Sequence, residues 1–548
     1  MRCYNSIEPQ MTTIHDILVV GSGPSGAQAA QTLAEAGVKV TMLDVGFKDE
    51  KYVKLVPEND FLSIRENEHG QHRYFLGDDF ESISLEKTSV GPQLTPPRNF
   101  LIEQVNKLLP LDSDTFQPME SLAYGGLGSG WVVGCSVFSK AELGKTGMDY
   151  FKMQEAYQVV CKRIGISAAK DDASPYTIGS LTGCQYPHVL DSNSAHLYDK
   201  YQKKKRKLNS QGFYLGRPAL ALLTENLGDR CKTLYNDMDF YSDKSSSAYR
   251  PWLTIEKLKQ AYNFNYINHR FVLSFKISNG AVEVMCLNTD SYEKEIFTCK
   301  KLILASGVLG TARIVLRSIN KENIRLPIIS NPFCYVPCIQ PKLIGRETEK
   351  KRMSFAQLVM FHDWDGTNSD VAVAALHSYR SLLLFKAIKE APLNYQDSRI
   401  IMQYLQSGIS IAGIHQPETG SEHKYIELVK DHNSVTGDKL KAHYSHSNDE
   451  KIKFKIREKK YMKALRSLNC YPLRKIHLNN GSSIHYGGTL PFSMNAEPYT
   501  LSPDGRLSGF QNVFAADGSG FKYLPAKGIT FSLMANAHNV AKNVLKND

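Results

Sequence analysis

A histidine and a group of glycines near the C-terminus have the residue types needed for proton transfer beside a bound ligand. The segment SSIHYGGTLPF, residues 482–492, places His485 two positions before Gly487-Gly488-Thr489. This many glycines disfavour a helix and let the backbone approach a ligand closely, so we expect His485 on a loop. A neutral imidazole, with an ordinary pKa of about 6.5, can take the proton of a substrate hydroxyl. The alternative is a histidine in a structural turn.

The N-terminal region carries a motif that could bind a dinucleotide. Gly21, Gly23 and Gly26 have the GxGxxG spacing between a buried strand at 17–20 and a helix that ends near Gly37. The first glycine permits a tight turn, the second lets the backbone approach a pyrophosphate, and the third lets the helix pack on the strand. The start of the helix offers free N–H groups to the phosphates, and its predicted contacts include Pro24 and Ser25.

An acidic residue completes this motif. A second strand, expected at 38–43, ends in Asp44. At this place a carboxylate accepts hydrogen bonds from the adenosine ribose hydroxyls, and it would repel the 2′-phosphate of NADP. The motif predicts FAD or NAD, and does not by itself separate the two.

Three further segments resemble one flavoprotein family. They are KLILASGVLGTARIVLRS at 301–318, AYGGLGSGWVVG at 123–134, and SSIHYGGTLPF followed by a C-terminal block at 504–545. In order and spacing they resemble the signature segments of the glucose-methanol-choline (GMC) oxidoreductases, which are FAD enzymes. The resemblance implies FAD as the cofactor.

Within that family the sequence is most similar to the pyranose oxidase branch. His485 to Thr489 match its His-x-Gly-Gly-Thr motif, and the segment from Gly125 to Trp131 aligns with its second motif. That branch attaches its flavin covalently through a histidine where this chain has Gly130, so the resemblance implies noncovalent FAD. It also places the Ser129 hydroxyl near flavin N5.

The resemblance also assigns roles to the C-terminal block. His485 would be the base that removes the hydroxyl proton, while the hydride passes to flavin N5. The closing helix, expected from residue 529, would direct its N-terminus at the flavin, where its dipole stabilises negative charge. The further cofactor contacts that the resemblance implies are Gly126, Val272, Gly307, Asp517, Gly518, Ile529 and Thr530.

One residue departs from the family pattern. Lys527 stands where the family has Asn or His beside the catalytic histidine, and Gly528 follows in place of proline. Three interpretations remain open: a cation that stabilises anionic flavin or binds an anionic substrate, a neutral second base, or a side chain that points to solvent. We take the first as the hypothesis because the residue lies at a helix N-terminus.

Length and composition narrow the class of protein. The chain has 548 residues, which predicts two or more domains. It has no apolar run near the ~18 residues of a membrane span and no secretory signal at its start. Its ten cysteines lack the paired spacing of a metal site. We therefore expect a cytoplasmic protein with reduced thiols and no metal.

The formal net charge of +11 is concentrated in two runs, KKKRK at 203–207 and KIKFKIREKKYMK at 451–463. A solvated basic face is one interpretation. The other is weak attraction to an anionic membrane surface, with the protein peripheral to it, or to a phosphate-bearing substrate. No nucleic-acid module is recognised, so nucleic acid is not expected as a partner.

The fold class expected is α/β (α+β overall), with a discontinuous Rossmann-like FAD-binding domain and a sheet-based substrate domain. The FAD-binding domain would comprise 1–150, 236–330 and 478–548, the last with the catalytic segment. The substrate domain would comprise 151–235, as a cap region, and 331–477.

Strands of the substrate domain are predicted from apolar or alternating segments. These are SFAQLVMFHDWD, DVAVAALHSY and IAGIHQP, and the alternation in IKFKI also favours a strand. A sheet over the flavin is the family's arrangement. Four residues could line its pocket and receive no role: His362, His377, His415 and Tyr404.

The function predicted is FAD-dependent oxidation of a CH–OH group in a sugar, polyol or glycoconjugate, with oxygen, a quinone or a carrier protein as the electron acceptor. The carbohydrate part rests on the pyranose oxidase resemblance. A redox-neutral flavin enzyme of the isomerase or mutase type is one alternative, motivated by Lys527. A flavin-binding partner protein without catalysis is the other.

Overall fold

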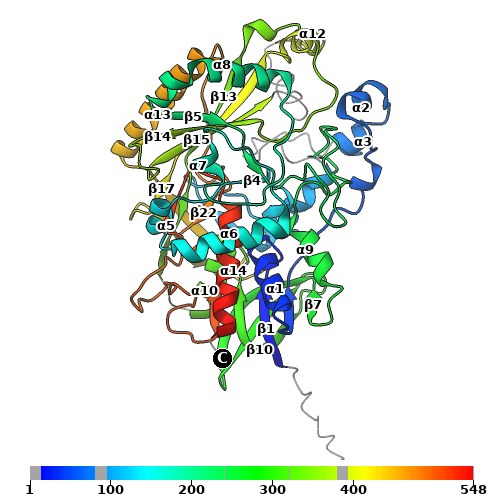
Figure 1. The fold of residues 1–548 in the computed structure, drawn as a ribbon. Coiled ribbons are helices and arrows are strands. Elements are labelled where there is room, and N and C mark those ends of the chain that lie inside the picture. Colours follow the sequence, from blue (N-terminus) through cyan, green and yellow to red (C-terminus); the bar gives the residue numbers. More distant parts are fainter. Residues whose placement is uncertain are drawn as a thin grey trace, which may run out of the picture.

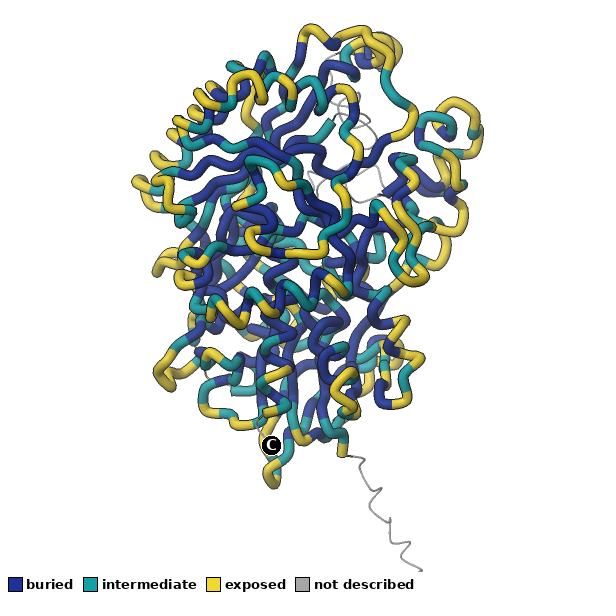
Figure 2. The backbone as a smooth tube through the Cα atoms, viewed as in Figure 1, coloured by how far each residue is buried: buried dark blue, intermediate teal, exposed yellow. Residues whose placement is uncertain are grey.

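The computed structural model describes residues 14–79, 96–239, 241–319, 321, 323–378 and 393–546. Two large sheets form its two ends, with smaller sheets and loops between them (Figure 1). Buried backbone runs continuously from one sheet to the other (Figure 2). None of the described helices has the length and apolar character required to cross a membrane.

The first large sheet, here called the mixed sheet, is built around β1 (Ile14–Val20), a β-branched strand buried at its carboxyl end. β1 pairs in parallel with β2 (Val40–Leu43) and β10 (Lys294–Leu304). Its other members are β7 (Phe264–Ile267), β8 (Arg270–Ser278), β9 (Ala281–Asn288) and β23 (Val513–Ala515). The strands thus come from three separated parts of the chain.

Helices cover the mixed sheet. α1 (Pro24–Glu35) follows β1, and its small buried residues let α14 (Thr530–Lys546) pack closely against it. Ala27 and Ala30 of α1 share one apolar cluster with Ala537 and Val540 of α14. Other helices pack nearby, namely α6 (Tyr150–Ile164), α9 (Pro251–Leu258) and α10 (Val308–Ile319).

The second large sheet, here called the antiparallel sheet, contains the predicted substrate-domain strands. It consists of β5 (Phe213–Gly216), β13 (Phe333–Ile339), β14 (Leu358–Asp363), β15 (Val371–Ser378), β16 (Ile409–His415), β20 (Tyr471–Pro472) and β21 (Ile476–His477). Side chains alternate between its two faces. One face, with Val336, Met360, Ala374 and Ile414, packs on two helices through residues such as Tyr201 and Leu465.

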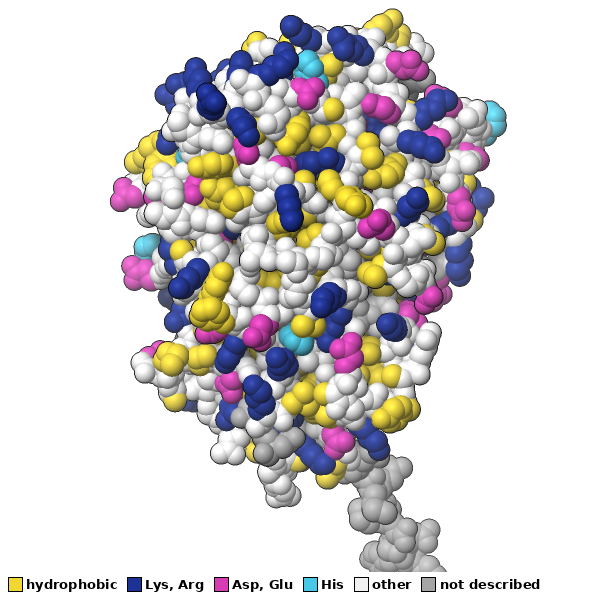
Figure 3. All heavy atoms as spheres, viewed as in Figure 1, with side chains coloured by type: hydrophobic (Ala, Val, Ile, Leu, Met, Phe, Trp, Pro, Cys, Tyr) yellow, Lys and Arg dark blue, Asp and Glu magenta, His cyan; other side chains and the backbone are white. Residues whose placement is uncertain are grey.

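Those two helices, α8 (Ser192–Asn209) and α13 (Asn448–Ser467), carry the basic runs. Their lysines and arginines are mostly exposed, and Figure 3 shows them gathered over this end of the molecule. The strand predicted for IKFKI is wrong, because the segment lies within α13. A capping box between Ser447 and Glu450 starts that helix at Asn448, four residues before Ile452.

The remaining elements are short. The helices are α2 (Phe61–Asn67), α3 (His72–Phe75), α4 (Val105–Leu108), α5 (Lys140–Thr146), α7 (Ser174–Thr177) and α12 (Tyr395–Leu405), besides 3₁₀ segments of three to seven residues. The strands are β3 (Leu111–Asp112), β4 (Gly134–Cys135), β6 (Ala219–Leu220), β11 (Arg325–Pro327), β12 (Ile329–Ser330), β17 (Glu418–Thr419), β18 (Lys424–Lys430), β19 (Asp438–Tyr444), β22 (Tyr486–Gly487) and β24 (Tyr523–Leu524).

Candidate active site

A cavity of about 840 Å³ extends from the carboxyl ends of β1 and β2 to the antiparallel sheet. Its wall contains most of the residues predicted from the sequence. They are Gly21, Gly23, Pro24, Ser25, Asp44, Gly126, Val272, Gly307, His485, Gly518, Lys527, Ile529 and Thr530. Gly26, Ser129 and Asp517 do not line it.

The glycine loop has the geometry of a phosphate cradle. Gly21 has φ +96°, and a Cβ there would lie 2.7 Å from the Ala305 carbonyl oxygen. A Cβ on Gly26 would lie 1.8 Å from the Gly21 oxygen, so this glycine serves helix packing. A Cβ on Gly23 would meet nothing within 4 Å, because that position faces the cavity. The space it would fill is where a phosphate can approach the backbone.

The start of α1 is open to a ligand. Gly23 is its N-cap residue and, among the described residues, no side chain caps it; Pro24 occupies the first turn. The first N–H groups of the helix therefore remain available to an anion. Gly307, with φ +80° and open space at its Cβ position, adds a second close approach of backbone to the cavity.

Asp44 is held at the edge of the cavity by its neighbours. Its Oδ2 accepts hydrogen bonds from the Ser22 hydroxyl at 2.5 Å and the Tyr266 hydroxyl at 2.9 Å. Burial raises its pKa to about 6. The side chain therefore ties the glycine loop to β2 and to β7, besides facing the place expected for a ribose.

Asp517 and Ser129 are engaged locally instead of reaching the cavity. The Asp517 carboxylate accepts from the Thr311 hydroxyl at 2.5 Å and the Ser519 hydroxyl at 2.6 Å. It thereby fixes the turn that presents Gly518. The Ser129 hydroxyl donates to the Tyr124 carbonyl oxygen at 2.6 Å. The proximity of the Ser129 hydroxyl to flavin N5 stays a prediction.

Strand pairing places His485 against a residue that sequence reasoning did not single out. β22 pairs with β12 antiparallel, Tyr486 opposite Ser330, so that the next positions, His485 and Asn331, come together. The Asn331 amide nitrogen donates to three backbone carbonyl oxygens, those of Gln416, Leu524 and Pro525. Its Oδ1 is thereby turned toward His485 Nδ1, 3.0 Å away.

This contact selects one tautomer of His485. An amide oxygen only accepts hydrogen bonds, so Nδ1 must carry the proton and Nε2 the lone pair. Burial lowers the pKa of His485 to about 4, which keeps the ring neutral at physiological pH. His485 therefore offers an unprotonated Nε2, the form required of a general base.

A second imidazole lies beside the first. The His415 ring, at the end of β16, stacks on His485 with centroids 5.2 Å apart. Burial and the neighbouring His485 lower its pKa well below the ordinary value. His377 and His415 both line the cavity. His362 instead lies on the opposite face, against Phe213, and Tyr404 is 63% exposed.

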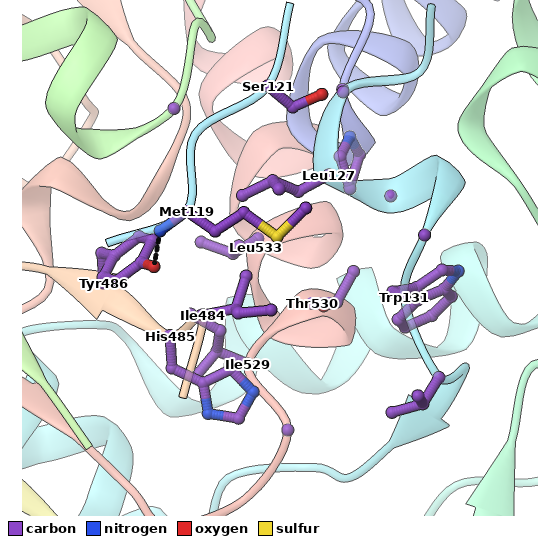
Figure 4. Close-up of a pocket in the computed structure, with 18 of the residues that line it drawn as sticks. Met119, Ser121, Leu127, Trp131, Ile484, His485, Tyr486, Ile529, Thr530 and Leu533 are labelled. Atoms are coloured by element: carbon purple, nitrogen blue, oxygen red, sulfur yellow. Dashed lines mark hydrogen bonds between the residues drawn. The ribbon is translucent and has the colours of Figure 1, made fainter. Parts of the chain in front are cut away.

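The start of α14 closes the cavity near His485. Figure 4 shows Ile484 and His485 projecting into the pocket near Ile529 and Thr530, with Met119 also in the wall. The Tyr486 hydroxyl accepts from the Met119 amide at 2.8 Å and donates to the Gly481 carbonyl oxygen. These bonds fix both ends of the His485 loop.

Lys527 lies just before α14 and is 1% exposed, so the alternative that points it to solvent is wrong. Its Nζ donates to Glu142 Oε2 at 2.7 Å and to the Val137 carbonyl oxygen at 3.1 Å. The ion pair is fully buried on both sides. The catalytic role of Lys527 stays a prediction.

Comparisons with known proteins bear on the fold and on the cofactor. A model of the family described as FAD binding domain matches residues 15–54. The crystal structure of pyridoxine 4-oxidase from Mesorbium loti matches with a TM-score of 0.58, covering 97% of this chain and 99% of that chain at 12% identity. No curated protein sequence matches the chain.

These findings confirm the fold predicted from the resemblance to the GMC oxidoreductases, and they confirm FAD as the cofactor. The glycine loop and the start of α1 fit FAD. The open space at the Cβ position of Gly23 and the uncapped N-terminus of α1 both suit the pyrophosphate of this cofactor. The chain is a flavoprotein with an FAD-binding domain. Noncovalent attachment stays a prediction.

Proposed function

We propose that this protein oxidises a CH–OH group to a carbonyl, with His485 as the base that removes the hydroxyl proton. The observation that carries the proposal is the contact from Asn331 Oδ1 to His485 Nδ1, at 3.0 Å. It leaves Nε2 as the proton acceptor on a residue that lines the same cavity as the glycine loop. The similar fold of pyridoxine 4-oxidase, which by its name oxidises pyridoxine, supports an oxidation in this cavity.

Each residue of the site has a separate role in the proposed reaction. FAD, when bound, supplies the acceptor for the hydride. His485 Nε2 takes the proton of the hydroxyl. Asn331 Oδ1 accepts a hydrogen bond from His485 Nδ1 and so fixes the orientation of the imidazole ring. The start of α14, with Ile529 and Thr530 in the wall, presents its positive dipole end to charge that develops in the cavity.

An anaerobic titration tests this function. The purified protein is mixed without oxygen with a panel of ring-bearing alcohols, sugars, polyols and simple alcohols, while the flavin band near about 450 nm is followed. We expect one class to bleach the band. Bound flavin that no alcohol bleaches would contradict the proposal and favour a redox-neutral or noncatalytic flavoprotein.

The pH dependence of the reductive half-reaction gives a second test. The pKa of His485 is lowered to about 4 by burial, and a base works in its unprotonated form, so activity is lost only as pH falls through that value. The reduction rate is expected to change less than about twofold between pH 7 and pH 5. A base with the ordinary histidine pKa would lose about 20-fold over that range. Stopped-flow pH jumps distinguish the two.

A further inference from the structure

The basic helices α8 and α13 lie on the side of the antiparallel sheet that faces away from the cavity. They pack on the sheet face that carries Met360 and Ala374. The preceding and following strand residues, Val359 and Ala375, point to the other face and line the cavity. A large partner that binds the outer sides of α8 and α13 therefore need not touch the cavity.

The side of α13 farthest from the sheet combines isoleucines with lysines. Side chains three or four positions apart share one side of a helix, and Ile452, Ile456, Lys459 and Lys463 follow that spacing. Tyr461, which is buried against the sheet, lies on the opposite side of the helix. Ile452 is 54% exposed and Ile456 is 44% exposed. Two large apolar side chains are thus presented to solvent among charged ones.

Further basic residues surround this stripe on both helices, which are adjacent because the Lys204 ammonium donates to the Ser467 carbonyl oxygen. The exposed acidic residues of the two helices are Asp199 and Asp449. In the part of the chain that the structure describes, the exposed cations of these helices without a carboxylate partner are Lys203, Arg206, Lys207, Lys451, Lys455, Lys459, Lys463 and Arg466. Figure 3 shows basic side chains gathered over these helices. Such a concentration of unpaired positive charge attracts polyanions.

The isoleucines decide which kind of polyanion fits. A solvated face or a nucleic-acid partner accounts for the lysines, but the phosphate backbone that dominates nucleic-acid binding offers no apolar layer to an isoleucine. At a bilayer surface, lysines contact anionic headgroups while neighbouring apolar side chains enter the boundary with the acyl chains. Ile452 and Ile456 lie one helical turn apart on the outermost side of α13, so both can enter the same layer.

We infer that the outer sides of α8 and α13 form a docking surface for an anionic lipid bilayer. The lysines and arginines contact the headgroups, and Ile452 and Ile456 insert beside them. Two inserted side chains bury little apolar area, so the binding is peripheral and reversible. The surface is remote from the cavity face of the sheet, and the inference does not rest on the proposed oxidation.

Co-sedimentation of the complete, flavin-loaded protein with vesicles tests this surface. Vesicles of phosphatidylcholine with about one third phosphatidylserine should retain the protein at low salt, and vesicles of phosphatidylcholine alone should not. Raising the salt from about 50 mM to about 300 mM should weaken retention about tenfold or more, because ions screen the attraction between lysines and headgroups.

Two double variants separate charge from insertion. Lys459→Gln with Lys463→Gln should lower the partition coefficient about 20–30-fold, because each cation near an anionic bilayer contributes a factor of about five. Ile452→Ser with Ile456→Ser leaves the net charge unchanged and should lower the partition coefficient about tenfold or more, because the inserted apolar area is lost.

The matched control is Lys39→Gln with Lys294→Gln, which removes two exposed lysines beside and within the mixed sheet. It makes the same change in net charge and should alter the partition coefficient less than about twofold. An unchanged melting temperature in all three variants verifies that each is folded.

Three results would overturn the inference. They are absence of retention on the anionic vesicles at low salt, an equal loss in the control variant, and tighter binding to transfer RNA that the isoleucine substitutions leave unchanged. Reduction of the flavin by an alcohol does not enter this test, so the docking surface and the proposed function can fail separately.

Discussion

Replacement of His485 by glutamine is expected to slow anaerobic reduction of the bound flavin by its alcohol about 10²–10⁴-fold, the usual contribution of a positioned general base. Glutamine retains a polar group near Asn331 but cannot take a proton at neutral pH. The flavin content should stay unchanged, because the pyrophosphate is expected at the glycine loop and His485 belongs to a different segment of the cavity wall. Stopped-flow absorbance under nitrogen measures the effect.

Two further variants sharpen this test. Asn331→Ala removes the acceptor that fixes the His485 tautomer, so the reduction rate should fall by less than in His485→Gln and respond differently to pH. His362→Gln is the matched control, since His362 is a buried histidine of β14 on the face opposite the cavity. A loss in His362→Gln as large as in His485→Gln would show that the effect is structural.

Substitution of Lys527 by methionine should have the largest effect on stability. It removes the partner of Glu142, whose carboxylate is fully buried and otherwise accepts from the Ser139 amide. An uncompensated buried charge costs about 3–5 kcal/mol. We expect a clear fall in the apparent melting temperature, measured by scanning calorimetry at equal flavin content. An unchanged melting temperature would contradict this account of the ion pair.

A double variant separates stability from catalysis at this position. Lys527→Met with Glu142→Gln removes both charges and should recover most of the lost stability. If Lys527 acts as a cation toward flavin or substrate, the stable double variant will still show a lowered flavin potential or a weakened substrate interaction. Parent-like potential and kinetics in that variant would make the lysine purely structural.

The N-terminal part of this site could be predicted because its signals are local. The strand, the three glycines, the helix and Asp44 all lie within 31 residues, 16–46, and each has a steric or electrostatic reason that the sequence alone displays. The structure places β1, α1 and β2 accordingly. The strands at 358–363, 371–378 and 409–415 were equally visible, because they are long apolar segments.

The catalytic surroundings could not be predicted in the same way. Asn331 and His415 reach His485 through the pairing of β12 with β22 and through the register of β16, which depend on contacts far apart in the chain. The local hydrogen bonds of Ser129 and Asp517 could not be predicted either, because short polar side chains readily bond to nearby backbone or hydroxyl groups in several alternative ways. The capping box of Ser447 and Glu450 indicates the start of a helix at α13. It is a better guide to the structure of this segment than the alternation of the five residues IKFKI.

The discontinuous mixed sheet also has a consequence for how the chain folds. β1 and β2 leave the ribosome well before β10, and β23 and α14 follow later still. Such high contact order slows folding, and unfinished chains expose apolar strands and the buried face of α1. The cavity wall, which includes Gly518, Ile529 and Thr530, is therefore complete only after these late segments have been made. A bound cofactor stabilises only chains that have formed the complete site, so FAD binding stabilises completed chains and not truncated ones.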